Sequence, residues 1–159
     1  MTARANRKEM IFDPGAIKVL FLSVMKRAKR KYAFRIENFC IMGNHFHLVI
    51  VPGKGVSLSS VMQWILSVFA MAYNRIFGYT GHVWGERFFS RILSGFRDLL
   101  AVFAYIDDNP VRANLVEDRR AWIFGGVWHS RTGCRDLVED DPPWTLLFFP
   151  ERGRLLLTN

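Results

Sequence analysis

The stretch CIMGNHFHLVIV, Cys40–Val51, decides the fold and holds the first candidate site. Its second half is apolar and β-branched, and a short Met-Gly-Asn turn joins it to a similar run over residues 34–41, so we predict a β-hairpin. Side chains of a strand alternate between two faces. We therefore expect His45 and His47 to project from one face, while Phe46 and its alternate neighbours enter a core on the other.

Apolar residues recur at helical spacing on both sides of this hairpin. The predicted elements are a helix over 14–31, strands over 34–41 and 45–51, a helix from Leu58 to Gly78, a strand over 83–93, and a helix that Ser94 caps and that ends near 108, before Pro110. This order predicts an α+β fold with helices packed on one face of an antiparallel sheet. We interpret residues 1–130 as the domain and 131–159 as an appendage packed on the same domain.

The composition predicts a single basic domain that binds a polyanion. The chain has 159 residues, of which 50% are hydrophobic, so it can bury a core. Its formal net charge of +8 favours nucleic acid as the partner. No apolar run approaches the ~20 residues that span a bilayer, so we expect no membrane partner. Cys40 and Cys134 lack paired-cysteine metal spacing, which is typical of a reduced, cytoplasmic protein, here associated with the nucleoid.

Two groups of residues are the candidates for a catalytic site. His45 and His47 on one strand face form a half-site for a divalent metal, although strand histidines are often ordinary polar-face residues. On the last predicted helix, Tyr105 lies off the buried stripe and Asn109 follows it by one turn, so the hydroxyl and the amide reach the same point. The alternatives are a boundary tyrosine held by its hydroxyl and an ordinary Asn-Pro helix stop.

Three blocks of the sequence resemble a known family. They are Gly43-Asn44-His45-Phe46-His47, Gly81-His82-Val83-Trp84-Gly85-Glu86-Arg87-Phe88 and Tyr105-Ile106-Asp107-Asp108-Asn109-Pro110-Val111-Arg112-Ala113-Asn114-Leu115-Val116. In order and spacing they look like the blocks of the REP-associated tyrosine transposases, which are single-tyrosine HUH transposases of the insertion-sequence-200 type. The resemblance covers roughly residues 3–130.

The resemblance implies a fold, an activity and roles for four residues. The fold is a ferredoxin-like antiparallel sheet backed by helices. The family cuts and rejoins single-stranded DNA beside hairpins through a 5′-phosphotyrosine, which leaves a free 3′-hydroxyl. His45 and His47 match the metal-binding histidines, Asn109 the amide ligand and Tyr105 the nucleophile. The implied cofactor is Mg²⁺ or Mn²⁺, and the implied partner is single-stranded DNA with hairpins, bound by a monomer or homodimer.

The sequence departs from the family at its opening. Relatives begin with a strand before the first helix, whereas the segment before Met10 is too short for a full one, so we expect the opening strand to be missing. No general base for Tyr105 is evident beyond Asp107 and Asp108.

Basic side chains are the expected contacts to DNA phosphates. They are Arg87 and Arg91 in and after the second block, Arg112 after the Asn-Pro pair, and Lys29 and Arg30 at the basic end of the first helix. A solvated helix face and a brace for the loop are the alternatives.

Three classes of function fit these residues. The first is a metal-dependent transposase with a tyrosine nucleophile. The second is a domesticated or truncated relative that binds DNA hairpins without cutting. The third is a metal-dependent phosphodiesterase that uses water, with Tyr105 only structural. Protein–DNA adducts that survive denaturation would form only with the first.

Overall fold

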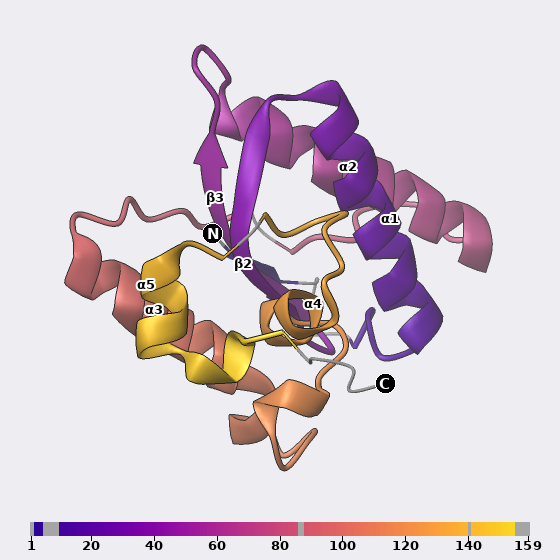
Figure 1. Cartoon of the computed structure of the whole chain (residues 1–159). Helices are drawn as coiled ribbons and strands as arrows, with labels where there is room; N and C mark the ends of the chain where they lie inside the picture. Colours follow the sequence, from indigo (N-terminus) through magenta and orange to yellow (C-terminus); the bar gives the residue numbers. More distant parts are fainter. Residues whose placement is uncertain (1, 5–9, 86–87, 140, 155–159) are drawn as a thin grey trace.

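A three-stranded antiparallel sheet forms the centre of the computed structural model, which describes residues 2–4, 10–85, 88–139 and 141–154 (Figure 1). The strands are β1 (Thr2–Arg4), β2 (Phe34–Ile41) and β3 (His45–Pro52), in the order β1-β3-β2. β3 is the middle strand, and its partners across the ladder fix its register: Thr2 and Cys40 both lie opposite His47.

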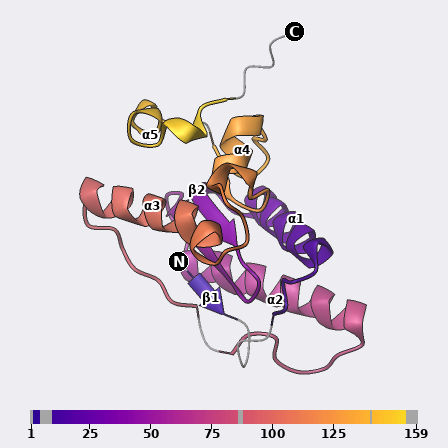
Figure 2. The same ribbon diagram turned by 90° about the horizontal axis from the view of Figure 1, so that it is seen from below.

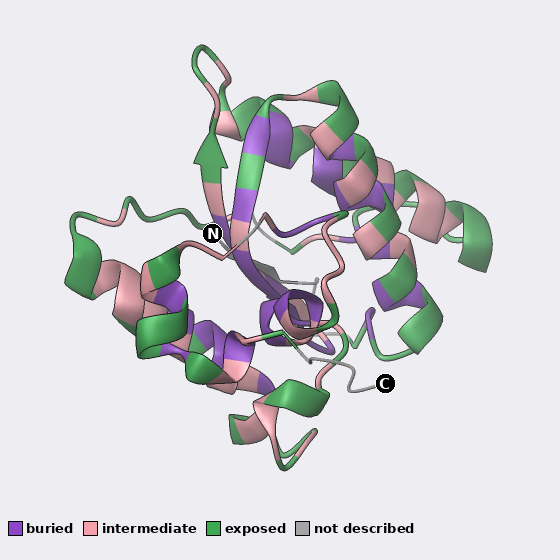
Figure 3. Cartoon of the chain, in the orientation of Figure 1, coloured by how far each residue is buried: buried purple, intermediate pink, exposed green. Residues whose placement is uncertain are grey.

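Helices cover both faces of the sheet. On one face, α1 (Gly15–Lys31) and α2 (Leu58–Phe77) enclose the larger core, which includes Phe46 and Leu48 of β3. On the other, α3 (Phe96–Arg112) packs Phe103 and Ile106 against Cys40 and Val49. Figure 2 shows β2 between α3 and α1, and Figure 3 shows the buried and exposed sides of α3.

A β-bulge gives β2 an apolar surface on each side. The pairing with β3 is irregular between Ile36 and Asn38. Ile36 therefore lies in the larger core, while Asn38 and Cys40 turn to the α3 side. The α+β class is confirmed. The prediction that the helices pack on one face is wrong, because after the bulge β2 turns buried side chains to both faces of the sheet, and helices pack on both.

The C-terminal part of the chain runs back over this sheet. Its elements are η2 (Arg119–Ala121), α4 (Gly126–Thr132), α5 (Pro143–Phe148) and η3 (Pro150–Arg152). Val138 forms a parallel bridge with Ile36 and is buried in the larger core. Phe149 is buried beside α3, and Trp144 packs against the same cluster. Residues after 131 thus contact both cores.

The predicted absence of an opening strand is wrong. Residues Thr2–Arg4 pair antiparallel with His45–His47, so even this short segment hydrogen-bonds to β3. Such pairing satisfies the outer amides and carbonyls of β3, which would otherwise form an open sheet edge.

The strand predicted over 83–93 is also wrong for the residues described there. They form isolated bridges only, and Ile92 is 92% exposed. Trp84 explains the apolar composition: its ring packs among Phe12, Phe21 and Phe69, and its Nε1 donates to the Leu66 carbonyl at 2.9 Å. One tryptophan anchors a loop where a strand was predicted.

The ends of α3 differ from prediction by a few residues. Gly95, not Ser94, is the N-cap, and Ser94 instead donates its backbone and hydroxyl hydrogens to the Asp98 carboxylate. Pro110 lies inside the helix, which continues to Arg112. Proline removes only its own donor, and the amides of Ala113 and Leu115 still donate to the carbonyls of Asn109 and Pro110.

No helix in the described part of the chain combines the length and the apolar character needed to cross a membrane.

Candidate active site

The two histidines of β3 project from the sheet face that α3 covers. His45 and His47 alternate with the fully buried Phe46 and Leu48, so strand geometry alone places both rings on one side. Their centroids are 4.9 Å apart with the rings edge to face. The Asn44 amide oxygen accepts a hydrogen bond from His45 Nδ1 at 2.7 Å, which leaves Nε2 as the nitrogen with a lone pair in the neutral ring.

Tyr105 reaches these histidines from α3. Its side chain is 47% exposed, and its ring lies edge to face with that of His47, with 5.3 Å between centroids. Phe103 and Ile106 face the core, so Tyr105 lies outside the buried stripe of this helix. The Arg112 guanidinium lies 5.6 Å from the centre of the Tyr105 ring. An accessible phenol thus lies between an imidazole and a fixed positive charge.

Asn109 is held one turn beyond Tyr105. Its amide nitrogen donates to the Tyr105 carbonyl at 3.0 Å, so this bond does not use the amide oxygen, which is the atom that ligates metals. Two imidazole nitrogens and one amide oxygen would together hold a divalent metal and leave coordination positions open. No group of three or more His, Cys, Asp or Glu that could hold a metal ion occurs among the described residues.

Neither aspartate of the third block is free to act as a base. The Asp107 side chain is fully buried and accepts two hydrogen bonds from Arg152, at 2.8 and 3.1 Å, so the suggestion that it serves Tyr105 is wrong. Burial raises the pKa of the Asp107 carboxyl, and Arg152 and Asn38 oppose that rise. Asp108 forms an ion pair with Arg119 at 2.7 Å.

The arginines that were predicted to contact DNA phosphates differ in their distance from the two histidines. Arg112 is exposed and stacks on Tyr105, so it belongs to the candidate site. Arg91 is exposed and forms a 3.7 Å ion pair with Asp98 on the first turn of α3. Arg87 lies outside the described residues.

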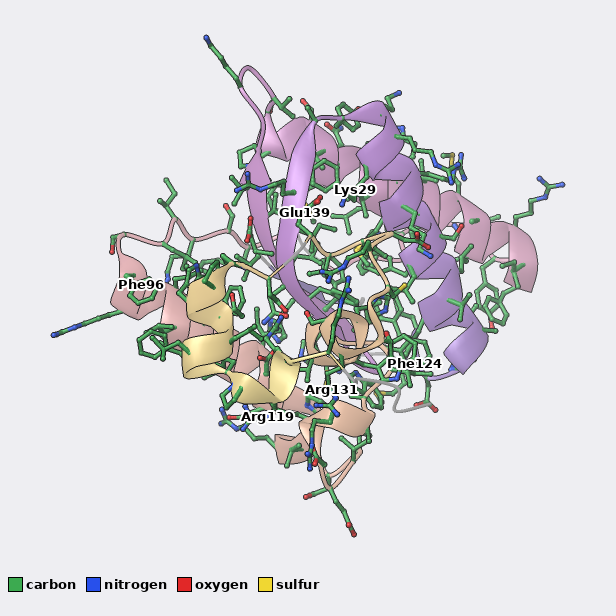
Figure 4. All side chains as sticks on the ribbon, in the orientation of Figure 1. Lys29, Phe96, Arg119, Phe124, Arg131 and Glu139 are labelled. Carbon is green, nitrogen blue, oxygen red and sulfur yellow. The ribbon has the colours of Figure 1, made fainter. Side chains whose placement is uncertain are left out.

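The basic end of α1 lies on the opposite face of the sheet from the histidines. Lys29 donates to Glu139 at 2.6 Å and to the Leu137 carbonyl at 2.9 Å. Lys29 and Glu139 are labelled in Figure 4. Arg30 is exposed on the same helix. The structure does not bring either residue to Tyr105.

Two residues that the sequence analysis did not identify contact α3 on the side away from Tyr105. Arg152 and Asn38 both hydrogen-bond to Asp107. Arg152 lies 45 positions from Asp107 in the sequence, in a segment without helical or strand periodicity. No sequence signal predicts this contact, because only the tertiary fold creates it.

The fold and the site define a class of protein: a small α+β sheet with paired strand histidines facing an accessible helix tyrosine. A family model described as "Transposase IS200 like" matches residues 1–109, and the chain belongs to this family. The resemblance stated from the three sequence blocks is thereby confirmed, and with it a transposase role. No curated protein matches the sequence.

A solved structure shares the fold. It is a REP-associated tyrosine transposase bound to a REP hairpin, and it is 22% identical in sequence with a TM-score of 0.68. The match covers 89% of this chain and 81% of the other.

Proposed function

We propose that this protein cuts and rejoins single-stranded DNA beside hairpins, with Tyr105 as the nucleophile and His45, His47 and Asn109 as ligands of Mg²⁺ or Mn²⁺. The observation that carries the proposal is the contact of the Tyr105 ring with His47, combined with the exposure of the tyrosine. This ring lies on the surface beside the proposed metal ligands.

The proposed step exchanges one phosphodiester bond for another. The Tyr105 oxygen loses its proton and attacks phosphorus, the bond from phosphorus to the 3′ oxygen breaks, and that oxygen takes up a proton. The products are a 5′-phosphotyrosine and a free 3′-hydroxyl. A second 3′-hydroxyl can reverse the step, because the covalent intermediate conserves the phosphodiester energy.

The residues of the chain position the groups for this step. α3 holds the phenol in place, and Arg112 supplies a positive charge beside it that neutralises a phosphate. His45, His47 and Asn109 would hold the divalent cation, which polarises the phosphate oxygens when bound.

The alternative is a relative that binds DNA hairpins without cutting. The solved structure that shares the fold contains a hairpin, which fits either proposal. The intact set of His45, His47, Tyr105 and Asn109 favours cutting.

The test is covalent trapping with a matched pair of tyrosine variants. Tyr105→Phe removes only a hydroxyl, so hairpin binding should persist while the adduct and cleavage vanish. Tyr79→Phe is the control, because Tyr79 is also exposed, at 60%, but packs against Phe77 at the end of α2. Each variant is incubated with Mn²⁺ and an end-labelled single strand beside a hairpin, and the products are resolved under denaturing conditions.

The outcomes separate the three classes of function. An adduct with wild type and Tyr79→Phe, absent from Tyr105→Phe, supports the proposal. Hairpin binding with neither adduct nor cleavage in wild type indicates the binding-only relative. Cleavage that persists in Tyr105→Phe without an adduct indicates a phosphodiesterase that uses water.

A further inference from the structure

A buried salt bridge joins the C-terminal segment to the helix of Tyr105. The side chains of Arg152 on η3 and Asp107 on α3 are both completely buried. Arg152 donates from Nη2 to Oδ1 at 2.8 Å and from Nε to Oδ2 at 3.1 Å, so the contact is bidentate. Such paired bonds fix direction as well as distance, because both planar groups must align.

The sheet completes this contact from the other side. Asn38 of β2 donates to Asp107 at 2.9 Å, and its own amide oxygen accepts from the Phe39 backbone at 2.8 Å. We call Arg152, Asp107 and Asn38 the clamp. Ser130 and Asp141 accept longer hydrogen bonds from Arg152, both at 3.4 Å. The clamp, together with Ser130 of α4 and Asp141, therefore links η3, α3, β2 and α4 in one polar network.

The clamp contacts α3 on the side opposite to Tyr105. The Arg152 guanidinium also lies 5.0 Å from the centre of the Phe103 ring, so it contacts the helix at two positions one turn apart. Tyr105 lies two residues from each of them, and two residues correspond to about 200° of helix rotation. A small rotation of α3 at the clamp would therefore displace Tyr105 relative to His47.

Packing of Phe103 and Ile106 sets which side of α3 faces the core, but the contacts at the edges of this buried stripe are looser. Leu99, Val102 and Ala104, which surround the buried stripe of α3, are only partly buried. A buried ion pair usually adds little net stability, since the desolvation of both charges offsets their attraction, but its geometry can select one arrangement. The clamp is thus better placed to determine the orientation of α3 than to strengthen the fold.

We infer that Arg152 and Asp107 are positioning residues for the reaction: their bidentate contact holds α3 in the rotation that keeps Tyr105 against His47. The inference rests on the proposed function where cleavage is concerned, but the orientation of Tyr105 can be measured without DNA. Neither residue touches the substrate in this account. Both act through the backbone of α3.

The test compares conservative variants on the free protein and on DNA. Arg152→Lys keeps the charge but loses the planar fork. The control is Arg131→Lys, because Arg131 donates to the Glu151 carbonyl at 2.9 Å, in the same C-terminal segment, without a hydrogen bond to α3. A double variant, Asp107→Leu with Arg152→Met, replaces the ion pair by apolar groups, so neither of these two charges stays buried without the other.

Two readouts are recorded for each variant, together with its thermal unfolding midpoint. The first is the nuclear Overhauser contact between the Tyr105 and His47 rings in the DNA-free protein. The second is the single-turnover cleavage rate at saturating hairpin DNA, with the DNA affinity measured separately. Arg152→Lys and the double variant should lose the ring contact and cut about tenfold to hundredfold more slowly, with unchanged affinity, since small misplacements of a reacting group have effects of this size.

Each outcome decides the inference. Arg131→Lys should keep both the ring contact and the rate, and a loss there would overturn the specific role of the clamp. A double variant as stable as wild type that retains the contact and the rate would overturn it too, because packing would then be sufficient. If wild type does not cut DNA, the proposed function fails, while the ring contact still decides whether the clamp orients Tyr105.

Discussion

At the residue scale, the two histidines are the most firmly placed part of the candidate site, since a paired strand holds both. His45→Ala or His47→Ala should weaken Mn²⁺ binding at least about tenfold, since losing even a residue that only hydrogen-bonds to a metal ligand has an effect of this size. Asn109→Ala should have a smaller effect. Isothermal titration with Mn²⁺ measures this, and His82→Ala, exposed on the loop after α2, is the control. Unchanged binding in both histidine variants would exclude the metal site.

Also at the residue scale, the structure separates basic residues that can meet phosphate from those with other partners. Arg112 is exposed beside Tyr105, whereas Lys29 is bonded to Glu139 on the far face of the sheet. Arg112→Gln should therefore lower the slope of log affinity against log salt by about one, and Lys29→Gln should leave it unchanged. Fluorescence anisotropy of a hairpin across a salt series gives both slopes. An equal decrease of the slope in both variants would indicate that DNA contacts both faces of the sheet.

At the element scale, α4 approaches the clamp so closely that its first residue must be glycine. A Cβ on Gly126 would overlap the amide oxygen of Asn38 and lie 3.2 Å from Arg152 Nη2. Gly126→Ala should destabilise the protein by about 1–3 kcal/mol, the usual effect of overpacking. Urea unfolding measures the change. Gly15→Ala at the start of α1 is the control, since its Cβ would meet only Phe124, at an ordinary 3.8 Å, and it should be neutral or slightly stabilising. Equal stability of both variants would contradict the steric argument.

The same scale shows what local patterns can and cannot predict. α1 and α2 follow from hydrophobic periodicity, because each buries one regular face, and the hairpin follows from two apolar runs joined by a short turn. The pairing of His47 with Tyr105 follows from strand alternation once α3 is placed on the correct face. The segment over 83–93 misleads because Val83 and Trp84 pack into the core from a loop, without the pairing of a strand. Arg152 could not be predicted, since its role depends on a contact between distant parts of the chain.

At the scale of the whole molecule, the C-terminal segment neutralises part of the basic surface. Lys26 pairs with Asp136 at 2.7 Å, and Lys29 pairs with Glu139 at 2.6 Å. Arg27 and Lys31 lie over the Trp64 ring, at 5.8 and 5.6 Å from its centre. The end of α1, which looks like a uniform cationic run in the sequence, is thus largely occupied by internal contacts. The face that carries Tyr105 and Arg112 remains the better place for DNA.

The stability of the whole fold should fall in mild acid because of one buried histidine. His129 on α4 is 4% exposed and packs edge to face against Phe39. Burial and, to a smaller extent, the Lys26 charge together lower the pKa of His129 from 6.5 to about 4, although Asp136 opposes this shift. The unfolded chain therefore binds a proton that the folded protein excludes, and stability is lost as the pH falls from 6.5 to about 4.

The loss attributable to His129 should reach about 3 kcal/mol at the acid end of this window. It is distinct from the contribution of Asp118, since Arg120 lowers the pKa of this carboxyl to about 2 and its contribution is lost only at more acidic pH, below the ordinary aspartate value. Urea unfolding of His129→Gln at pH 7 and at pH 4.5 should show a much smaller difference than in wild type. His82→Gln, on an exposed loop, should keep the full difference. If His129→Gln also keeps it, other groups cause the acid sensitivity, and the buried imidazole does not control it.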